Sequence, residues 1–210
     1  ARPLLLGLIA VSVVSGASGE GLDRLGEAHF LRNFAFPSIG DFRPEPVVWF
    51  GIINLGASLL GLAAAEAVAR RVDTSDGFQA ARALLVLESL RIGGILVFGL
   101  AGGFALALAS YWVVGAVSAV ARPIRGAWLN RNIDPSVRAT VLSIDSQANS
   151  LGQLAGGPAI GAFGTAYGLR AAMVAAGLVL SPALWLYGRC LKPEGTEPSV
   201  PQAVRSTQPE

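Results

Sequence analysis

The chain has 210 residues, of which 52% are hydrophobic and 14% charged, and its mean hydropathy is +0.54. Soluble domains carry about 25% charged residues, so a soluble fold of this size could not bury so much apolar surface, and the lipid bilayer is the expected solvent. The net charge is +2, but the basic residues stand at predicted helix ends rather than in a patch, so no nucleic-acid partner is expected.

The apolar stretches predict an all-α membrane protein with six transmembrane helices, because a spanning helix needs about 20 mostly apolar residues. We place these helices at about residues 3–22, 46–67, 82–100, 103–122, 138–164 and 169–188, within one domain of residues 1–190. The third and fourth helices come from one long apolar run that Gly102 and Gly103 divide. Residues 191–210 hold four prolines among polar residues and are predicted to form a disordered cytoplasmic tail.

The basic residues predict the orientation of the helices. With six spans both chain ends lie on one side, and that side carries 11 Lys and Arg residues against four on the other. Cytoplasmic loops carry an excess of Lys and Arg, so both ends are expected in the cytoplasm and the protein in the plasma (inner) membrane. The longest loop on the outer side, about residues 23–45, holds Phe30, Phe34, Phe36 and Phe42, which are expected to rest at the membrane interface.

Two groups of charged residues lie in or beside the predicted spans. One stands at the end of the first helix, with members on neighbouring helix faces: Glu20, Asp23, Arg24 and Glu27. Either this cluster lines a polar path from the outer surface, or the helix emerges into water there. The other group is Glu88 and Arg91, three residues apart in the third helix, for which we favour a structural ion pair.

A polar stripe follows the start signal of the fifth helix, where Asp134 is a candidate N-cap and Pro135 a candidate first residue. Asp145, Asn149 and Gln153 follow at steps of four. An acid and two amides on one face should point to other helices or to an aqueous cavity rather than to lipid. Either the stripe handles substrate and protons, with Asp145 as the central group, or it forms interhelical hydrogen bonds without a ligand.

The same helix continues with small residues at spacings that permit close helix contact. They are Gly152, Gly156, Gly157 and Gly161. Pro158 removes one backbone hydrogen bond among them and predicts a kink. A closely packed, kinked helix suits a transporter that rocks between two states, although such helices occur in many membrane proteins.

The residues needed for enzymatic chemistry are missing from the sequence pattern. Gly16-Ala17-Ser18-Gly19 has the GxSG form of intramembrane serine proteases, whose serine needs a histidine on a later helix. The single histidine, His29, stands at or past the end of the same predicted helix. One histidine and one cysteine are also too few for a zinc site, so neither an enzyme nor a cofactor is expected.

The carboxyl-terminal part carries a family resemblance. From Pro123 to Ser181 the sequence reads PIRGAWLNRNIDPSVRATVLSIDSQANSLGQLAGGPAIGAFG, a short turn, and YGLRAAMVAAGLVLSPAL. It resembles helices ten to twelve of the major facilitator superfamily, in which RATVLS, SQANSLGQ and GGPAIG follow in this order. The opening GEGLDRLGEAHFLRNF resembles helix seven of the bacterial drug-efflux-like members, and GGPAIG is similar to the Gly-Pro motif of antiporters.

The resemblance implies a twelve-helix transporter with two six-helix halves around a central cavity, of which this chain supplies helices seven to twelve without the amino-terminal half. It also implies alternating access for a small-molecule substrate, commonly coupled to protons, with Tyr111 and Trp112 as possible substrate-facing aromatics. The candidate substrate or proton pathway comprises Glu20, Asp23, Arg24, Trp112, Asp145, Asn149 and Gln153. The alternative is a self-contained six-helix membrane protein with a structural or scaffold role.

Overall fold

The computed structural model describes residues 2–38, 40–41, 43–69 and 76–191. Within these ranges the chain forms α-helices and one short 3₁₀ helix and has no strand, which confirms the predicted all-α class. The elements are α1 (Arg2–Asn33), α2 (Pro46–Ala69), α3 (Gly77–Leu100), α4 (Phe104–Arg131), η1 (Pro135–Val137), α5 (Arg138–Tyr167), α6 (Leu169–Val179) and α7 (Ser181–Cys190). The predicted disordered tail lies outside the described residues, apart from Leu191.

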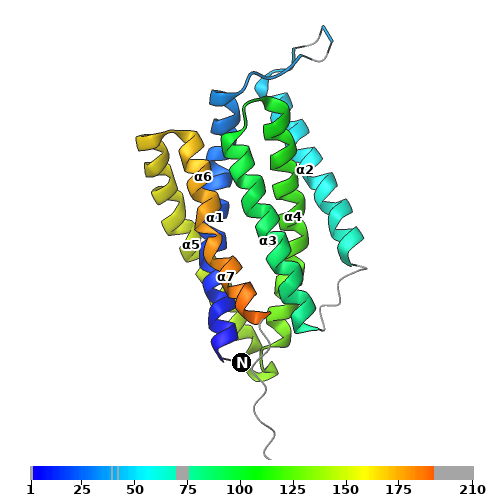
Figure 1. Ribbon diagram of the computed structural model, residues 1–210, viewed down its shortest axis with the longest axis vertical. Coiled ribbons are helices and arrows are strands. Elements are labelled where there is room, and N and C mark those ends of the chain that lie inside the picture. Colours follow the sequence, from blue (N-terminus) through cyan, green and yellow to red (C-terminus); the bar gives the residue numbers. More distant parts are fainter. Residues whose placement is uncertain (1, 39, 42, 70–75, 192–210) are drawn as a thin grey trace, which may run out of the picture.

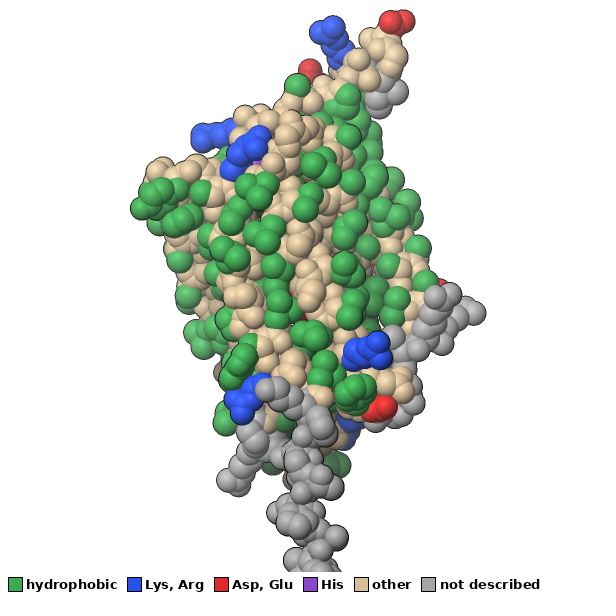
Figure 2. Space-filling model, in the orientation of Figure 1, with side chains coloured by type: hydrophobic (Ala, Val, Ile, Leu, Met, Phe, Trp, Pro, Cys, Tyr) green, Lys and Arg blue, Asp and Glu red, His purple; other side chains and the backbone are tan. Residues whose placement is uncertain are grey.

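The helices stand side by side in one bundle, and successive helices run in opposite directions, with α6 and α7 following one path (Figure 1). We call the end that holds the start of α1 and the end of α7 the terminal end, and the opposite end the loop end. α5 packs against α1 and α6, α2 packs against α4, and α3 packs against α4, α6 and α7. Charged side chains on the face in Figure 2 gather at the two ends, with hydrophobic side chains between them.

Five segments are long and apolar enough to cross a membrane, as in a multi-pass integral membrane protein. They are Leu4–Asn33, Pro46–Val68, Gly77–Leu100, Phe104–Arg131 and Leu169–Cys190. α5 is not among them, although its 30 residues exceed the length that a span needs. Its polar residues lower its hydropathy, and several of them line a cavity between the helices.

α1 continues to Asn33, well past the predicted end near residue 22, so the expected outer loop does not begin at residue 23. The last turns of α1 stay helical because they are buried against α3. His29 is fully buried, and its Nε2 lies 3.1 Å from the carbonyl oxygen of Phe98. Phe30 is buried too, with 1% of its surface exposed. Because α1 continues to Asn33, the charged cluster lies inside this helix rather than at its end.

Proline explains the other difference in helix bounds. The predicted last helix, 169–188, is two helices that meet at Leu180, because Pro182 in the first turn of α7 has no N–H to continue the ladder of α6. By contrast, α5 runs through Pro158 without a break. At the start of α5, Asp134 caps η1: Ser136 donates from its N–H at 2.8 Å and its hydroxyl at 2.6 Å, which lowers the pKa of the Asp134 carboxyl.

Two apolar clusters hold the bundle together, one toward each end. The loop-end cluster is rich in aromatic rings, and Phe30 contacts Phe34, Phe98 and Tyr111 at centroid distances of 5.1–5.9 Å. The terminal-end cluster includes Leu84, Trp128 and Tyr187. Phe30 and Phe34 are therefore core residues and do not rest at the membrane interface as expected, because the extension of α1 packs Phe30 against rings of other helices and Phe34 against Phe30. Phe42 lies outside the described residues.

Candidate functional site

A partly open cavity of about 690 Å³ lies between the helices of the bundle. Its walls come from six helices, because the two apolar clusters fill the bundle toward its ends and leave a polar region along the facing sides of α1, α3, α4 and α5. An intramembrane cavity with many ionisable side chains is costly to build, so it indicates function. Its charged lining residues are Glu20, Asp23, Glu88, Arg91, Arg122, Arg125 and Asp145.

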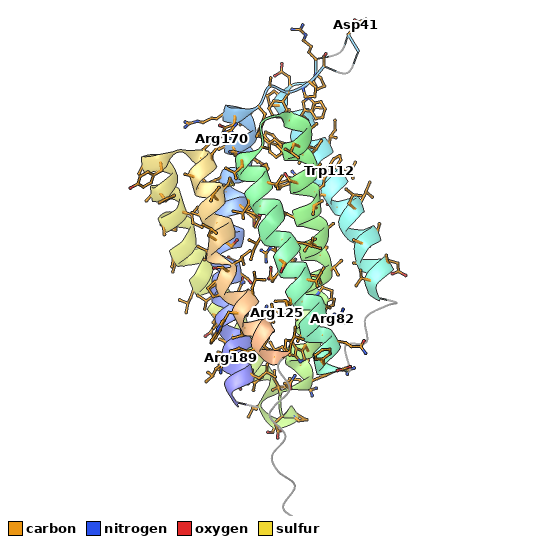
Figure 3. All side chains as sticks on the ribbon, in the orientation of Figure 1. Asp41, Arg82, Trp112, Arg125, Arg170 and Arg189 are labelled. Carbon is orange, nitrogen blue, oxygen red and sulfur yellow. The ribbon has the colours of Figure 1, made fainter. Side chains whose placement is uncertain are left out.

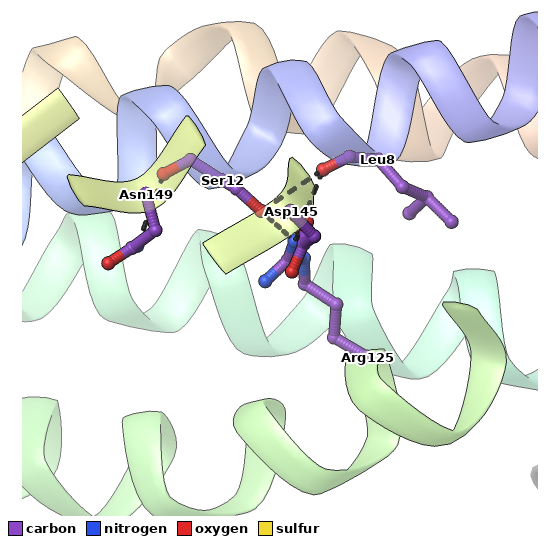
Figure 4. Close-up of polar contacts among 5 residues, drawn as sticks. All are labelled: Leu8, Ser12, Arg125, Asp145 and Asn149. Atoms are coloured by element: carbon purple, nitrogen blue, oxygen red, sulfur yellow. Dashed lines mark hydrogen bonds and ion pairs between the residues drawn. The ribbon is translucent and has the colours of Figure 1, made fainter. Parts of the chain in front are cut away.

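Asp145 of α5 is held by α1 and α4 (Figure 4). Arg125 Nη2 donates to Asp145 Oδ1 at 2.6 Å and to the Leu8 carbonyl oxygen at 3.2 Å, and it also bonds the Ser12 hydroxyl. Ser12, fully buried, donates to Asp145 as well. Since the side chains of Arg125 and Asp145 are 19% and 18% exposed, this ion pair is largely shielded from water.

The two amides of the stripe make different contacts. Asn149 Nδ2 donates to the Ser12 carbonyl oxygen at 3.2 Å, so it joins α5 to α1. Gln153 Nε2 donates to Asn149 Oδ1 at 2.8 Å within α5 and leaves its own carbonyl free to face the cavity. The stripe therefore combines the two interpretations that the sequence left open: it bonds neighbouring helices and also lines the cavity. Its role in substrate or proton handling stays a prediction.

The charged cluster of α1 divides between the cavity and the outside. Glu20 and Asp23 line the cavity. Arg24 pairs with Glu20, but its side chain is 74% exposed and it is not among the lining residues, in contrast to its predicted place in the pathway. The reason is helical geometry, because one residue step of about 100° turns Arg24 away from the wall that Asp23 faces.

Glu88 and Arg91 form the expected ion pair, with Glu88 Oε1 3.5 Å from Arg91 Nη1. Both side chains are nevertheless part of the cavity wall. Glu88 is 4% exposed, and its second oxygen, Oε2, has no hydrogen-bond partner within the described part of the chain. The pair thus joins two residues of α3 and is also a candidate part of the site. The three-residue spacing predicted the ion pair but not its place on the cavity wall.

Trp112 does not line the cavity. It lies on α4 in the half of the bundle toward the loop end (Figure 3), and its indole N–H donates to the Ile53 carbonyl oxygen of α2 at 2.9 Å. The ring packs so closely on Gly56 that an added Cβ there would lie 2.6 Å from it. The neighbouring Tyr111 lines the cavity instead, since the next residue on a helix points about 100° away.

Trp112→Phe is therefore expected to weaken the contact between α2 and α4 and leave substrate binding unchanged. The variant loses one hydrogen bond, which should lower the free energy of unfolding by about 1 kcal/mol. Thermal unfolding of the purified protein measures this change. A fall in substrate affinity without a loss of stability would instead assign Trp112 to the site.

The glycines of α5 differ in what they contact. A Cβ on Gly152 would collide with the backbone of Val13, and one on Gly156 with the backbone of Ala17, so both glycines let α1 and α5 touch. A Cβ on Gly157 would meet only the Glu20 side chain, at 2.9 Å from Cγ. Gly161 has nothing within 4 Å, so it is not a packing residue as predicted.

Arg122, Arg125 and Tyr187 are cavity residues that the sequence analysis did not select. Arg122 stood at the predicted end of the fourth helix, 103–122, and Arg125 just beyond it, and both counted among the basic residues that set the orientation. α4 instead continues to Arg131, because Trp128 and Leu129 are buried in the terminal-end cluster. The apolar spacing of Ile124, Trp128 and Leu129 is the signal that could have extended the helix.

No protein-family model and no curated protein matches this sequence. Among solved structures, the chain is similar to the POT family transporter PepTSo in its in meso crystal form, with a TM-score of 0.72 and 12% sequence identity. The match covers 90% of this chain and 37% of the transporter chain, so this chain spans little more than a third of that protein. The likeness shows the fold alone: a bundle of helices arranged like part of that transporter.

Proposed function

We propose that this chain is the carboxyl-terminal half of a secondary active transporter that moves a small solute by alternating access. The observation that carries the proposal is the polar cavity of about 690 Å³ in the middle of an otherwise apolar bundle with a transporter fold. Seven charged side chains line this cavity, and placing each of them within the membrane costs free energy. A purely structural bundle would gain nothing in return for that cost.

The exposed helix faces support a second six-helix unit as partner. Only 17% of the most apolar window of α2 is buried. The buried residues of α5 lie on one narrow face: Ala148, Gly152, Gly156 and Ile160. The polar residues of α5 could not face lipid cheaply, so the partner we propose covers the cavity side of α2 and α5. Such a partner would complete the cavity and supply the rest of the substrate contacts.

We further propose proton-coupled efflux across the plasma membrane, with both ends of the chain in the cytoplasm. The support for this orientation is the excess of Lys and Arg that the sequence predicts for the terminal end, where Arg82 and Arg189 lie in Figure 3. Acidic residues on the cavity wall supply groups that could exchange protons, and Asp23 is the one among them that forms no ion pair within the described part of the chain.

Alternating access predicts that one cavity position is reached by water from both sides of the membrane in turn. Ser118 of α4 lines the cavity and, among the described residues, bonds only the Val114 carbonyl oxygen of its own helix, so Ser118→Cys should preserve the fold. With Cys190, the single cysteine of this sequence, and any cysteine of the proposed partner half replaced by serine, a membrane-impermeant thiol reagent should modify Ser118→Cys in right-side-out and in inside-out vesicles of the intact protein.

Val97→Cys provides the matched control, because Val97 is 42% exposed on the outer surface of α3 and does not line the cavity. This position should face lipid and react from neither side. Reaction of Ser118→Cys from one side only, with the rate unaffected by any transported solute, would contradict alternating access and favour a structural or scaffold role.

The proposed half-transporter status is tested by the mass of the native polypeptide. An antibody raised against the sequence of residues 192–210 should detect, in native membranes, a band near twice the 21.6 kDa of this chain. A band near 21.6 kDa would contradict a continuous twelve-helix protein and require a separate partner chain or a second copy.

A further inference from the structure

His29 lies toward the loop end of the bundle, and both of its ring nitrogens are bonded. It is fully buried in α1, and its Nε2 lies 3.1 Å from the carbonyl oxygen of Phe98, near the end of α3. Its Nδ1 lies 3.1 Å from the side-chain nitrogen, Nδ2, of Asn33, the last residue of α1. Asn33 Oδ1 lies 3.3 Å from the guanidinium Nε of Arg170, in the first turn of α6 at the loop end (Figure 3). One chain of hydrogen bonds therefore joins three helices.

The two ends of this chain fix the direction of every hydrogen bond in it. A guanidinium can only donate and a carbonyl oxygen can only accept. Arg170 thus donates to Asn33 Oδ1, which leaves Asn33 Nδ2 facing His29. Nδ2 also lies 3.2 Å from the His29 carbonyl oxygen, and this bond favours the same orientation of the amide. The His29 ring must then accept at Nδ1 and donate from Nε2 to Phe98, so it is neutral and in the Nε2–H tautomer.

A proton on His29 Nδ1 would break this chain. Both nitrogens of a protonated imidazole are donors, so Nδ1–H would face Asn33 Nδ2, which is also a donor. Turning the Asn33 amide over would remove that clash but would place Nδ2 against Arg170, which only donates as well. Neither orientation of the amide satisfies both neighbours. Protonation of His29 therefore costs a bond inside α1 or the bond between α1 and α6.

The surroundings of His29 provide no partner for a positive charge. The rings of Phe98 and Phe34 pack edge-on against it, with centroids 4.8 and 5.3 Å away. Arg170 of α6 is the charged side chain whose field acts on His29, and it repels a second cation. Tyr111, a titratable residue of α4 in the same cluster, contacts Phe98. Within the described ranges no carboxylate bonds the His29 ring, so the closed arrangement requires the neutral form.

We propose that this chain is a pH-sensitive latch, which holds the start of α6 to α1 and α3 while His29 is neutral and releases it when His29 is protonated. The loop-end latch comprises Arg170, Asn33, His29 and Phe98. Asn33 is half-buried and Arg170 is exposed, so protons reach the latch from the loop end. In the proposed orientation this end faces the outside of the cell. The latch goes beyond the proposed transport function and does not depend on it.

The direction of the pH dependence follows from where the proton binds. The open form binds it and the closed form does not, so the closed form is favoured as the pH rises. A free imidazole takes up a proton near pH 6.5, so release should begin below about pH 6.5. Because one proton is bound, the ratio of open to closed molecules should rise by up to about tenfold for each pH unit below that value.

Nitrogen-15 NMR of the labelled histidine tests the closed form directly. In the intact protein at pH 8, His29 should show a protonated Nε2 and an unprotonated Nδ1. Both signals are assigned by their loss in His29→Gln. At pH 5 the two nitrogens should move to the shifts of an imidazolium. The opposite tautomer at pH 8, or a neutral imidazole at pH 5, would overturn the latch.

Spin labels measure the release of α6. Leu31→Cys on α1 and Tyr167→Cys on α5, just before α6, place labels at exposed positions of the loop end, with all other cysteines replaced by serine. Pulsed electron–electron resonance on the intact protein should give one short distance at pH 8. A longer distance should appear and predominate at pH 5. A parent protein that keeps the short distance alone at pH 5 would contradict the release.

Three variants separate the latch from general effects of acid. His29→Gln keeps a donor for Phe98 but binds no proton, so its distances should not change with pH. Asn33→Asp places a carboxylate between His29 and Arg170, so it should keep the short distance at pH 5. Arg32→Gln is the matched control and should respond like the parent, because Arg32 is exposed beside Asn33 and forms no ion pair with any described residue.

A pH-dependent distance that persists in His29→Gln would assign the change to another group and overturn the latch. Failure of the latch is distinguishable from failure of the transport proposal, because neither measurement contains a transport step. Two-sided labelling of Ser118→Cys together with a pH-independent distance would reject the latch alone. A released α6 at pH 5 without two-sided labelling would retain the latch and reject alternating access.

Discussion

Gly152→Ala and Gly156→Ala are each expected to separate α1 from α5 and to lower the free energy of unfolding by about 2–3 kcal/mol. At both positions the added methyl group meets backbone: the nearest atoms are the carbonyl oxygen of Val13 and the Cα of Ala17. Backbone inside a helix cannot rotate aside as a side chain can, so one of the two helices must move. Because Asn149 and Asp145 bond Ser12 from the same helix face, their bonds should be lost together.

Two glycines of the same helix serve as controls. Gly157→Ala meets only the flexible side chain of Glu20 and should cost less, while Gly161→Ala meets nothing and should be neutral or slightly stabilising, since alanine favours the helix. Unfolding of all four variants in mixed micelles, followed by circular dichroism, gives the order. Equal stability of Gly152→Ala and Gly161→Ala would show that α1 and α5 do not touch there.

Loss of Arg125 should be comparably severe. Arg125→Ala leaves Asp145 charged, largely buried and bonded only by Ser12, and breaking such a pair typically costs about 3–5 kcal/mol. Asp145→Ala should cost a similar amount, because it leaves the guanidinium without its carboxylate. The double variant should be less destabilised than the sum of the two single variants, which a double-mutant cycle of unfolding free energies measures. Additive effects would mean that the two charges do not interact.

Asp145→Asn probes function at the same place. The amide has nearly the same shape and can still accept from Ser12, so the protein should insert into the membrane, while the weaker bond to Arg125 should impair transport in the intact protein. Insertion is measured by membrane fractionation and transport by solute flux at several pH values. Unchanged, pH-dependent transport would exclude Asp145 as the proton-coupling residue.

The sequence alone was sufficient to predict the all-α fold class and many of the polar residues that line the cavity. Hydropathy is a local property of the chain, so the apolar runs predicted the helices, and the cost of polar groups in lipid selected Glu20, Asp23, Asp145, Asn149 and Gln153. All five line the cavity. The three-residue spacing of Glu88 and Arg91 likewise predicted their pair, because neighbours on one helix face are fixed by helical geometry alone.

Only the tertiary structure decided which side of each helix faces the cavity and where the helices end. Trp112 and Arg24 differ from their neighbours Tyr111 and Asp23 by one helical step, and nothing in the local sequence says which of them points inward. The ion pair of Arg125 with Asp145 and the packing of Tyr187 on Trp128 join residues from different helices. Such contacts depend on packing between segments far apart in the chain, so helical periodicity, which acts within one segment, could not reveal them.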